Sequence, residues 1–303
     1  MAVRIMYGFF IAVPLLGLIA SIVLLWGPGI DWIHLALLGG GYIFTGLGIT
    51  IGYHRLFTHK AFATPRWMML FWGIVGSMAA EGPLLTWVGV HRKHHQHSDD
   101  ELDPHSPNFG RSAGLLGVLR GWLHAHVGWI VMARPNSGAS ARYTADLRRD
   151  PLIRFVDRYW WLWIALGLLL PGLIAWAVTG TVWGGVLGVL WGGLVRILVV
   201  HHITWSVNSA CHLWGSQSYR SHDESRNNPI FGVLALGEGW HNNHHAFPTS
   251  ARHGLAWWQF DLSWLVIRAM QAVGLAHQVR LPSPERMAAL STAGTAADPE
   301  TSP

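Results

Sequence analysis

Cysteine is nearly absent from this chain, whose 303 residues include only Cys211. A single thiol excludes a disulfide framework, a Cys-ligated iron–sulfur cluster and a Cys-rich zinc site within the chain. The sequence also lacks an HPGG haem motif and a flavin fingerprint. If the protein carries out a redox reaction, its electrons must therefore come from another protein.

Charge is scarce as well. Charged residues make up 12% of the chain, apolar residues make up 51%, and 19 residues are Trp. These proportions exclude an ordinary soluble domain and indicate a membrane protein. Runs of about 20 apolar residues can cross a bilayer, and they occur at about 7–26, 33–53, 160–178 and 181–200. The first run is too long for a signal-peptide core and lacks a small-residue cleavage site, so we expect it to be retained.

The two links between paired spans, Gly27–Trp32 and Gly180, contain no Lys or Arg. Of the 21 basic residues, 13 lie in 54–160 and six lie from 201 onward. The positive-inside rule therefore places the N-terminus and both of these regions in the cytoplasm. The net charge of +5 reflects this sidedness and does not indicate a nucleic-acid partner. Arg196, near the cytoplasmic end of the last span, is expected to snorkel or pair.

Three further apolar segments are short or interrupted by polar residues: Trp67–Ala80, Leu115–Met132 and Leu255–Ala276. We expect them to lie along the membrane interface. A crossing at the first segment would separate the histidines before it from those after it. From Ser283 to Pro303, small residues, Pro and Glu dominate, and this composition predicts a disordered tail.

Histidine is abundant, with 19 residues. The pattern HxxHH occurs twice, and its spacing i, i+3, i+4 puts three imidazoles on one helical face, enough for one metal shell. A looser pair precedes them, and Asn208 and His212 form a further i, i+4 pair. Eight imidazoles exceed the four ligands of a structural zinc and predict a site for two metal ions. These candidate catalytic and metal-binding residues are His54, His59, His91, His94, His95, His241, His244 and His245.

His54 and His59 present a geometric difficulty. Five residues at 100° each leave their side chains about 140° apart on an ideal α-helix. An undisturbed helix cannot direct both at one metal ion. Either the helix ends between them, or the pair serves two neighbouring metal ions.

Five stretches resemble the membrane-bound fatty acid desaturases, particularly the stearoyl-CoA Δ9-desaturase group. They are GYHRLFTHKAF (52–62), HRKHHQHSD (91–99), DPHS (103–106), TWSVNSACH (204–212) and GEGWHNNHHAFPTSARHG (237–254). The resemblance implies an all-α membrane protein with four transmembrane helices and a cytosolic helical cap, in one domain over residues 1–282. It also implies two iron ions (Fe2+) held by the eight histidines above and His212, with Asn208 reaching one iron through water.

The activity implied by the resemblance is O2-dependent desaturation of a long-chain saturated acyl group, at Δ9 on acyl-CoA. Electrons would come from a ferredoxin or cytochrome b5-like donor with its reductase. A saturated methylene has no acidic proton and no leaving group, so acid–base groups alone cannot activate it. Two departures leave an acyl lipid open as the substrate: an Arg-Asp pair that contacts CoA in animal enzymes is Gly89-Val90 here, and a downstream basic pair is Ala133-Arg134.

The resemblance also suggests residues of a substrate tunnel. Glu81, where the family usually has Gln, together with Trp87 and Thr204 matches the bend of that tunnel. Tyr42 matches its blind end, with Gly46 one turn nearer the iron. Tyr42 precedes His54 by 12 residues, about 18 Å along a helix, so it would lie deeper in the membrane than the metal site.

Two other functions remain open from the sequence. A membrane di-iron hydroxylase of acyl or alkyl chains shares the histidine motifs and differs in its product, an alcohol instead of a double bond. A His-rich metal transporter or sensor would place its ligands within the bilayer. The histidine motifs here fall at the predicted cytoplasmic ends of the spans.

Overall fold

The computed structural model of the protein describes residues 2–24, 31–108, 114–132 and 141–292. These residues form helices joined by loops and contain no strand, which confirms the all-α class for this part of the chain. The link at 27–30 and the pair Ala133-Arg134 lie outside the described residues. In chain order the helices are α1 (Ala2–Leu24), α2 (Trp32–Leu47), η1 (Gly48–Thr58), α3 (Arg66–Ser77), α4 (Leu84–His97), α5 (Leu115–Leu123), η2 (His124–Gly128), α6 (Trp129–Met132), η3 (Leu147–Arg149), α8 (Pro151–Arg158), α9 (Trp160–Thr179), α10 (Val182–Gly188), η4 (Val189–Val195), α11 (Arg196–Ser209), η5 (Ala210–His212), α12 (Pro229–Leu234), α13 (His241–Ala246), α14 (Leu262–Ala272) and α15 (Pro284–Leu290).

Four helical segments are long and apolar enough to cross a membrane: Trp32–Thr58, Leu115–Met132, Trp160–Thr179 and Val182–His212. Three of them match the predicted spans 33–53, 160–178 and 181–200. The predicted span at 7–26 falls in α1, whose described apolar stretch, Ile11–Val23, is shorter than a full crossing.

Leu115–Met132 differs from the prediction, because its length and composition match those of a span and not only those of an interfacial segment. The convergence of the histidines limits where it can lie. His94 and His212 belong to one histidine group. Two spanning segments, Trp160–Thr179 and Val182–His212, lie between His94 and the end of the second segment at His212. A third crossing between them would put these histidines on opposite sides. Histidines on one side of the membrane must be separated by an even number of crossings. This requirement favours an interfacial position for Leu115–Met132.

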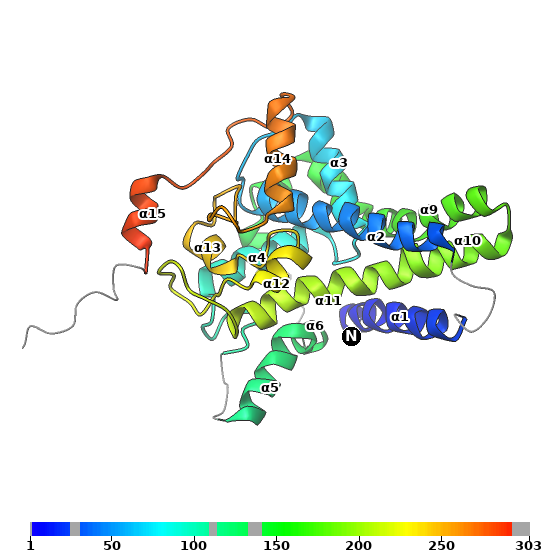
Figure 1. Cartoon of the computed structure of the whole chain (residues 1–303), viewed down its shortest axis with the longest axis horizontal. Helices are drawn as coiled ribbons and strands as arrows, with labels where there is room; N and C mark the ends of the chain where they lie inside the picture. Colours follow the sequence, from blue (N-terminus) through cyan, green and yellow to red (C-terminus); the bar gives the residue numbers. More distant parts are fainter. Residues whose placement is uncertain (1, 25–30, 109–113, 133–140, 293–303) are drawn as a thin grey trace, which may run out of the picture.

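Two of the spanning segments are longer than a bilayer requires. Trp32–Thr58 has 27 residues and Val182–His212 has 31. At 1.5 Å per residue these are about 40 and 46 Å, against a hydrocarbon core of about 30 Å. The surplus length is enough for the ends that carry His54 and His212 to extend beyond such a core. In Figure 1 the turn between α9 and α10 lies at one end of the molecule, whereas α4 and α13 lie towards the other.

Arg196 does not snorkel as the sequence suggested, because its side chain is buried between helices. Its Nη1 donates to the carbonyl of Met78 at 2.8 Å, its Nη2 to that of Gly167 at 2.9 Å and its Nε to that of Gly192 at 3.1 Å. Main-chain oxygens thus satisfy a guanidinium that has no carboxylate partner among the described residues. This residue joins α9, η4 and the turn after α3.

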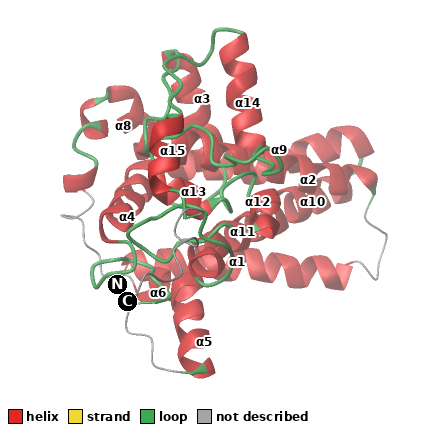
Figure 2. Cartoon of the chain, turned by 60° about the vertical axis from the view of Figure 1, so that its left-hand side comes forward, coloured by secondary structure: helices red, strands yellow, loops and turns green. Residues whose placement is uncertain are grey.

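The C-terminal region is more ordered than its composition predicted. Helix α15 occupies Pro284–Leu290, the Arg220 N–H donates to the Leu290 carbonyl at 2.7 Å, and the Thr292 N–H donates to the Ser218 carbonyl at 3.1 Å. Residues 283–292 are therefore ordered, contrary to the expectation of a disordered tail from residue 283. Residues 293–303 lie outside the described part. Figure 2 shows that loops concentrate around α13, whereas α9 and α10 form a regular helical end.

Candidate metal centre

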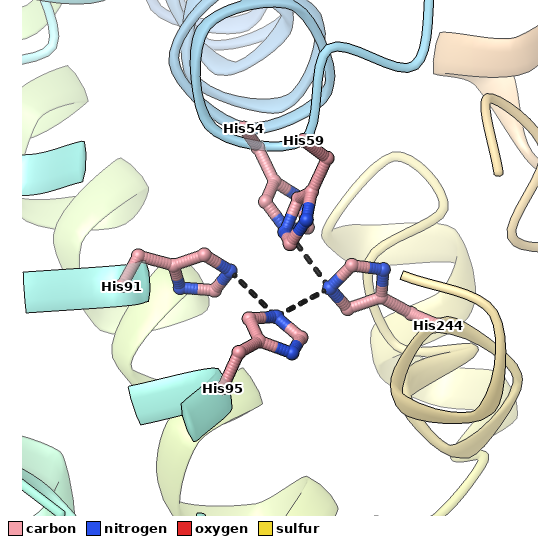
Figure 3. Close-up of side chains that lie close together, drawn as sticks. All are labelled: His54, His59, His91, His95 and His244. Carbon is pink, nitrogen blue, oxygen red and sulfur yellow. Dashed lines mark hydrogen bonds between the residues drawn. The ribbon is translucent and has the colours of Figure 1, made fainter. Parts of the chain in front are cut away.

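Five histidines from three separate segments point towards one another (Figure 3). Each offers one ring nitrogen, and these atoms all lie within 4.8 Å of one another. The Nε2 atom of His244 lies 3.0 Å from Nε2 of His54 and 2.8 Å from Nε2 of His95. We call this set the five-histidine group: His54 and His59 from the η1 segment, His91 and His95 from α4, and His244 from α13.

A π-helix accounts for the presence of both His54 and His59 in this group. Segment η1 is a π-helix, and the His59 N–H that follows it donates to the His54 carbonyl at 3.1 Å. Hydrogen bonds from i to i+5 bring residues five apart onto one face. The helix ends at Thr58, between the two residues, as one expectation from the sequence held, and His59 is its C-cap. The other expectation was wrong, because both rings belong to the same group.

The four remaining histidines form a second buried set, the four-histidine group: His94, His212, His241 and His245. Here Nε2 of His212 lies 3.0 Å from Nε2 of His241. Each HxxHH motif is therefore divided between the two groups, which corrects the expectation that one motif supplies one metal shell. Together the groups contain all nine histidines that the resemblance implied as ligands.

Four carboxylates contact the outer Nδ1 atoms of these rings. The distance from the ring Nδ1 to a carboxylate oxygen is 3.0 Å for His94 and Asp103 and 2.9 Å for His212 and Asp99. It is 2.5 Å both for His245 and Asp223 and for His54 and Glu238. An Nδ1–H bonded to a carboxylate leaves Nε2 as the free ligand atom and fixes the plane of the ring. This is the arrangement found around metal-binding histidines.

These carboxylates ionise readily despite their burial. Burial alone raises the pKa of Asp103, but the charge and hydrogen bond of His94 outweigh it and hold the pKa below the ordinary range. The same balance, with His54 as the strongest lowering contact, depresses the pKa of Glu238. The sequence reasoning assigned no role to the four acids. Asp99, Asp103 and Glu238 lie inside the stretches that carry the resemblance, whereas nothing local distinguished Asp223.

The inner ring nitrogens fit a metal ion. The Nε2 atoms of His59, His94 and His245 are buried and have no hydrogen-bond partner. Such buried polar atoms are rare unless something satisfies them. Burial also lowers the pKa of His95 and His244 well below its usual value. The rings are then neutral, which is the form that binds a metal.

A cavity of about 720 Å³ adjoins both groups, because His54, His91 and His241 form part of its wall. All five residues expected to shape a tunnel, Tyr42, Gly46, Glu81, Trp87 and Thr204, line the same cavity, as does Asn208.

Hydrogen bonds hold three of these five residues. The Tyr42 hydroxyl donates to the Leu234 carbonyl. The Trp87 Nε1–H donates to the Glu81 carboxyl at 2.8 Å. Burial raises the pKa of Glu81 to about 7, although this hydrogen bond opposes the shift.

A family model described as fatty acid desaturase matches residues 30–280. The chain belongs to the fatty acid desaturase family. It is 43% identical over 241 residues to the sn-1 stearoyl-lipid 9-desaturase of Anabaena variabilis, covering 79% of this chain and 81% of the relative. It is 41% identical over 283 residues to the hex-5-enoyl-[acyl-carrier protein] acetylenase of Moorena producens, covering 89% of this chain and 84% of that relative. The sn-1 stearoyl-lipid 9-desaturase of Synechocystis sp. is 40% identical over 249 residues, covering 82% and 72%.

Membership confirms the family inferred from the five stretches and makes this desaturase an oxidoreductase of fatty acid metabolism. Its long apolar helices suit such a membrane-embedded enzyme. Its two histidine groups are the place where the family and the structure both indicate a metal site.

Proposed function

We propose that this desaturase introduces a Δ9 double bond into a long-chain saturated acyl group, with O2 as oxidant and two iron ions held by the five- and four-histidine groups. The observation that carries the proposal is the shared cavity, whose wall includes histidines from both groups and the five tunnel residues. The overall reaction balances as one acyl chain, O2, two electrons and two protons giving the unsaturated chain and two waters.

The nine histidines and their carboxylates fit a pair of iron ions, and Asn208 lies in the wall of the same cavity. Bound iron would supply the redox activation of O2 that cleavage of an unactivated C–H bond requires. The protein holds one acyl segment beside the metals and excludes water. Glu81, Trp87 and Thr204 shape the bend, and Tyr42 closes the blind end.

For the acyl carrier we propose a membrane lipid, although the sequence first suggested acyl-CoA. Two of the relatives above are named for stearoyl-lipid. The change of an Arg-Asp pair to Gly89-Val90 removes a contact to CoA, which agrees with this choice. The electron donor is a ferredoxin or cytochrome b5-like protein with its reductase, and both termini and the metal site face the cytoplasm.

Expression in a host that makes only saturated chains, followed by gas chromatography–mass spectrometry with double-bond location, tests the function. A Δ9 alkene in a lipid class is expected. An alcohol would instead indicate a hydroxylase. Full turnover by a protein that contains only zinc would contradict the oxidative mechanism, because zinc has no redox chemistry.

A further inference from the structure

One face of α4 extends along the cavity from the bend towards the end of the helix. Thr86, Gly89, Val90 and Lys93 all line the cavity. Their spacing of i, i+3, i+4 and i+7 puts them in one row on a helix. Thr86 and Lys93 are seven residues apart, about 10 Å along the axis. Lys93 therefore lies about two turns from the part of α4 that carries Trp87 and follows Glu81.

Lys93 differs chemically from everything else in this wall. It is the only Lys or Arg among the described residues that line the cavity. Its side chain is partly exposed. No ion pair or hydrogen bond of its ammonium group occurs within the described ranges, whereas Lys60 pairs with Asp146 at 2.6 Å.

The neighbours of Lys93 on this row have no side chain or a short one. Gly89 has no side chain and Val90 has a short one, and both lie one turn from Lys93 on the same row. Tyr143 and Pro104 line the cavity as well. A compact ammonium with three donors binds phosphate oxygens well. An uncharged sugar would leave that charge without a counter-ion.

We infer that Lys93 binds the phosphate of the acyl carrier and so makes the desaturase selective for phosphate-bearing substrates over neutral glycolipids. This inference rests on the proposed desaturation of a carrier-bound acyl chain. The acyl chain extends past Thr86 to the metals and the blind end, while its headgroup remains at Lys93. The phosphate can belong to a phospholipid or to a soluble carrier such as CoA.

The test uses full-length, iron-loaded protein with a ferredoxin and its reductase. Stearoyl groups are offered on phosphatidylglycerol in vesicles, on CoA, and on monogalactosyldiacylglycerol, which has no phosphate. Lys93→Gln is compared with Lys93→Arg and with Arg154→Gln. The last removes the same charge from an exposed position on α8.

For Lys93→Gln we expect the KM for a phosphate-bearing carrier to rise about tenfold or more, as for loss of a charged hydrogen bond. The kcat, the bound iron and the KM for the galactolipid should change little. Lys93→Arg should restore most of the affinity, and Arg154→Gln should match the wild type. An effect confined to phosphatidylglycerol identifies a membrane phospholipid as the source of the phosphate, and one confined to CoA identifies a soluble carrier.

Equal changes in KM for the galactolipid and the phosphate-bearing carriers would overturn the inference, as would a wild type that accepts only the galactolipid. The salt response of the wild type keeps the inference testable if the Lys93 variants do not fold. Its KM for the phosphate-bearing carrier should rise with ionic strength while that for the galactolipid stays constant, and a flat response for both would also overturn the inference. Absence of a double bond on every carrier would instead reject the proposed function.

Discussion

The two histidine groups are assembled differently although they lie side by side. In the four-histidine group, three of the four rings contact a carboxylate through Nδ1. In the five-histidine group, as far as the described residues go, only His54 has such a contact, to Glu238 at 2.5 Å. Carboxylates outside the four-histidine group orient its rings. In the five-histidine group, helix geometry and a fifth ring take that role. We therefore expect the two groups to lose metal under different conditions.

Removing one ligand from either group should have the largest effect. His94→Ala opens the four-histidine group and His244→Ala opens the five-histidine group. Each should abolish desaturation and reduce bound iron from two ions per chain to about one, because the groups share no ligand atom. The apolar spans do not depend on these rings, so membrane insertion should persist. Product analysis and metal content at matched expression check this, and normal product from either variant would contradict a shared reaction centre.

The carboxylates allow a finer distinction between the groups. Loss of such a partner typically lowers metal affinity 10- to 100-fold. In the wild type, a chelator titration should release the iron of the five-histidine group first. Asp223→Asn should weaken the four-histidine group and bring the two release steps together. Glu224→Gln, an exposed neighbour that pairs with Arg226, is the matched control. Simultaneous release of both irons in the wild type would show that the groups do not differ in this way.

The blind end of the cavity is connected to the five-histidine group through one helical face. Tyr42, Gly46, Thr50 and His54 are spaced four residues apart and all line the cavity. Tyr42→Ala should extend the space beyond this face and shift preference several-fold towards longer chains. A Cβ at Gly46 would lie 2.9 Å from Leu236 Cδ1, so Gly46→Phe should favour shorter chains or inactivate the enzyme. Competition among saturated C14 to C20 substrates measures this, and an unchanged profile in both variants would place the end elsewhere.

Low pH should destabilise the folded protein through both histidine groups, because each contains buried rings with a lowered pKa. Burial lowers the pKa of His95 and His244 in one group and of His241 in the other well below the ordinary value. Below about pH 6.5 the unfolded chain takes up protons at these rings, whereas the folded chain does not.

The metal-free protein should therefore lose stability as the pH falls from 6.5, by about 1.4 kcal/mol per pH unit for each such ring. The Tm of the metal-free protein measured between pH 8 and 5 tests this. His95→Asn should make the decline shallower, and a Tm that is independent of pH would contradict it.

Much of this site could be predicted because its ligands repeat locally. The HxxHH spacing and the order of the stretches identified the nine histidines that the structure brings together. The π-helix could not be predicted, because it depends on packing against α3. A Cβ at Gly48 would lie 2.5 Å from the Gly76 nitrogen, and one at Gly52 would lie 2.8 Å from the Trp72 carbonyl. No local pattern encodes such contacts.

The acids and Arg196 were missed for the same reason. Asp223 reaches His245 from 22 residues away, and nothing in its own neighbourhood marks it as a partner. The snorkelling expected of Arg196 assumed a free helix end, whereas its acceptors come from residues as far away as Met78. The pattern of apolar and polar residues in Leu115–Met132 also could not show whether this segment lies along the membrane interface or spans the membrane. That distinction depended on where the histidines meet.

The buried guanidinium of Arg196 has a consequence for the order of assembly. A charged side chain facing hydrocarbon without partners is costly, and its cost falls when neighbouring carbonyls surround it. The acceptor at Met78 precedes the last hairpin in the chain, whereas Gly167 lies in α9, the first helix of that hairpin. The last hairpin can therefore settle in the bilayer only against helices that are already in place. Inserted alone, it would leave Nη1 of Arg196 without its Met78 acceptor, so biogenesis of this protein should proceed from the N-terminal helices to the final pair.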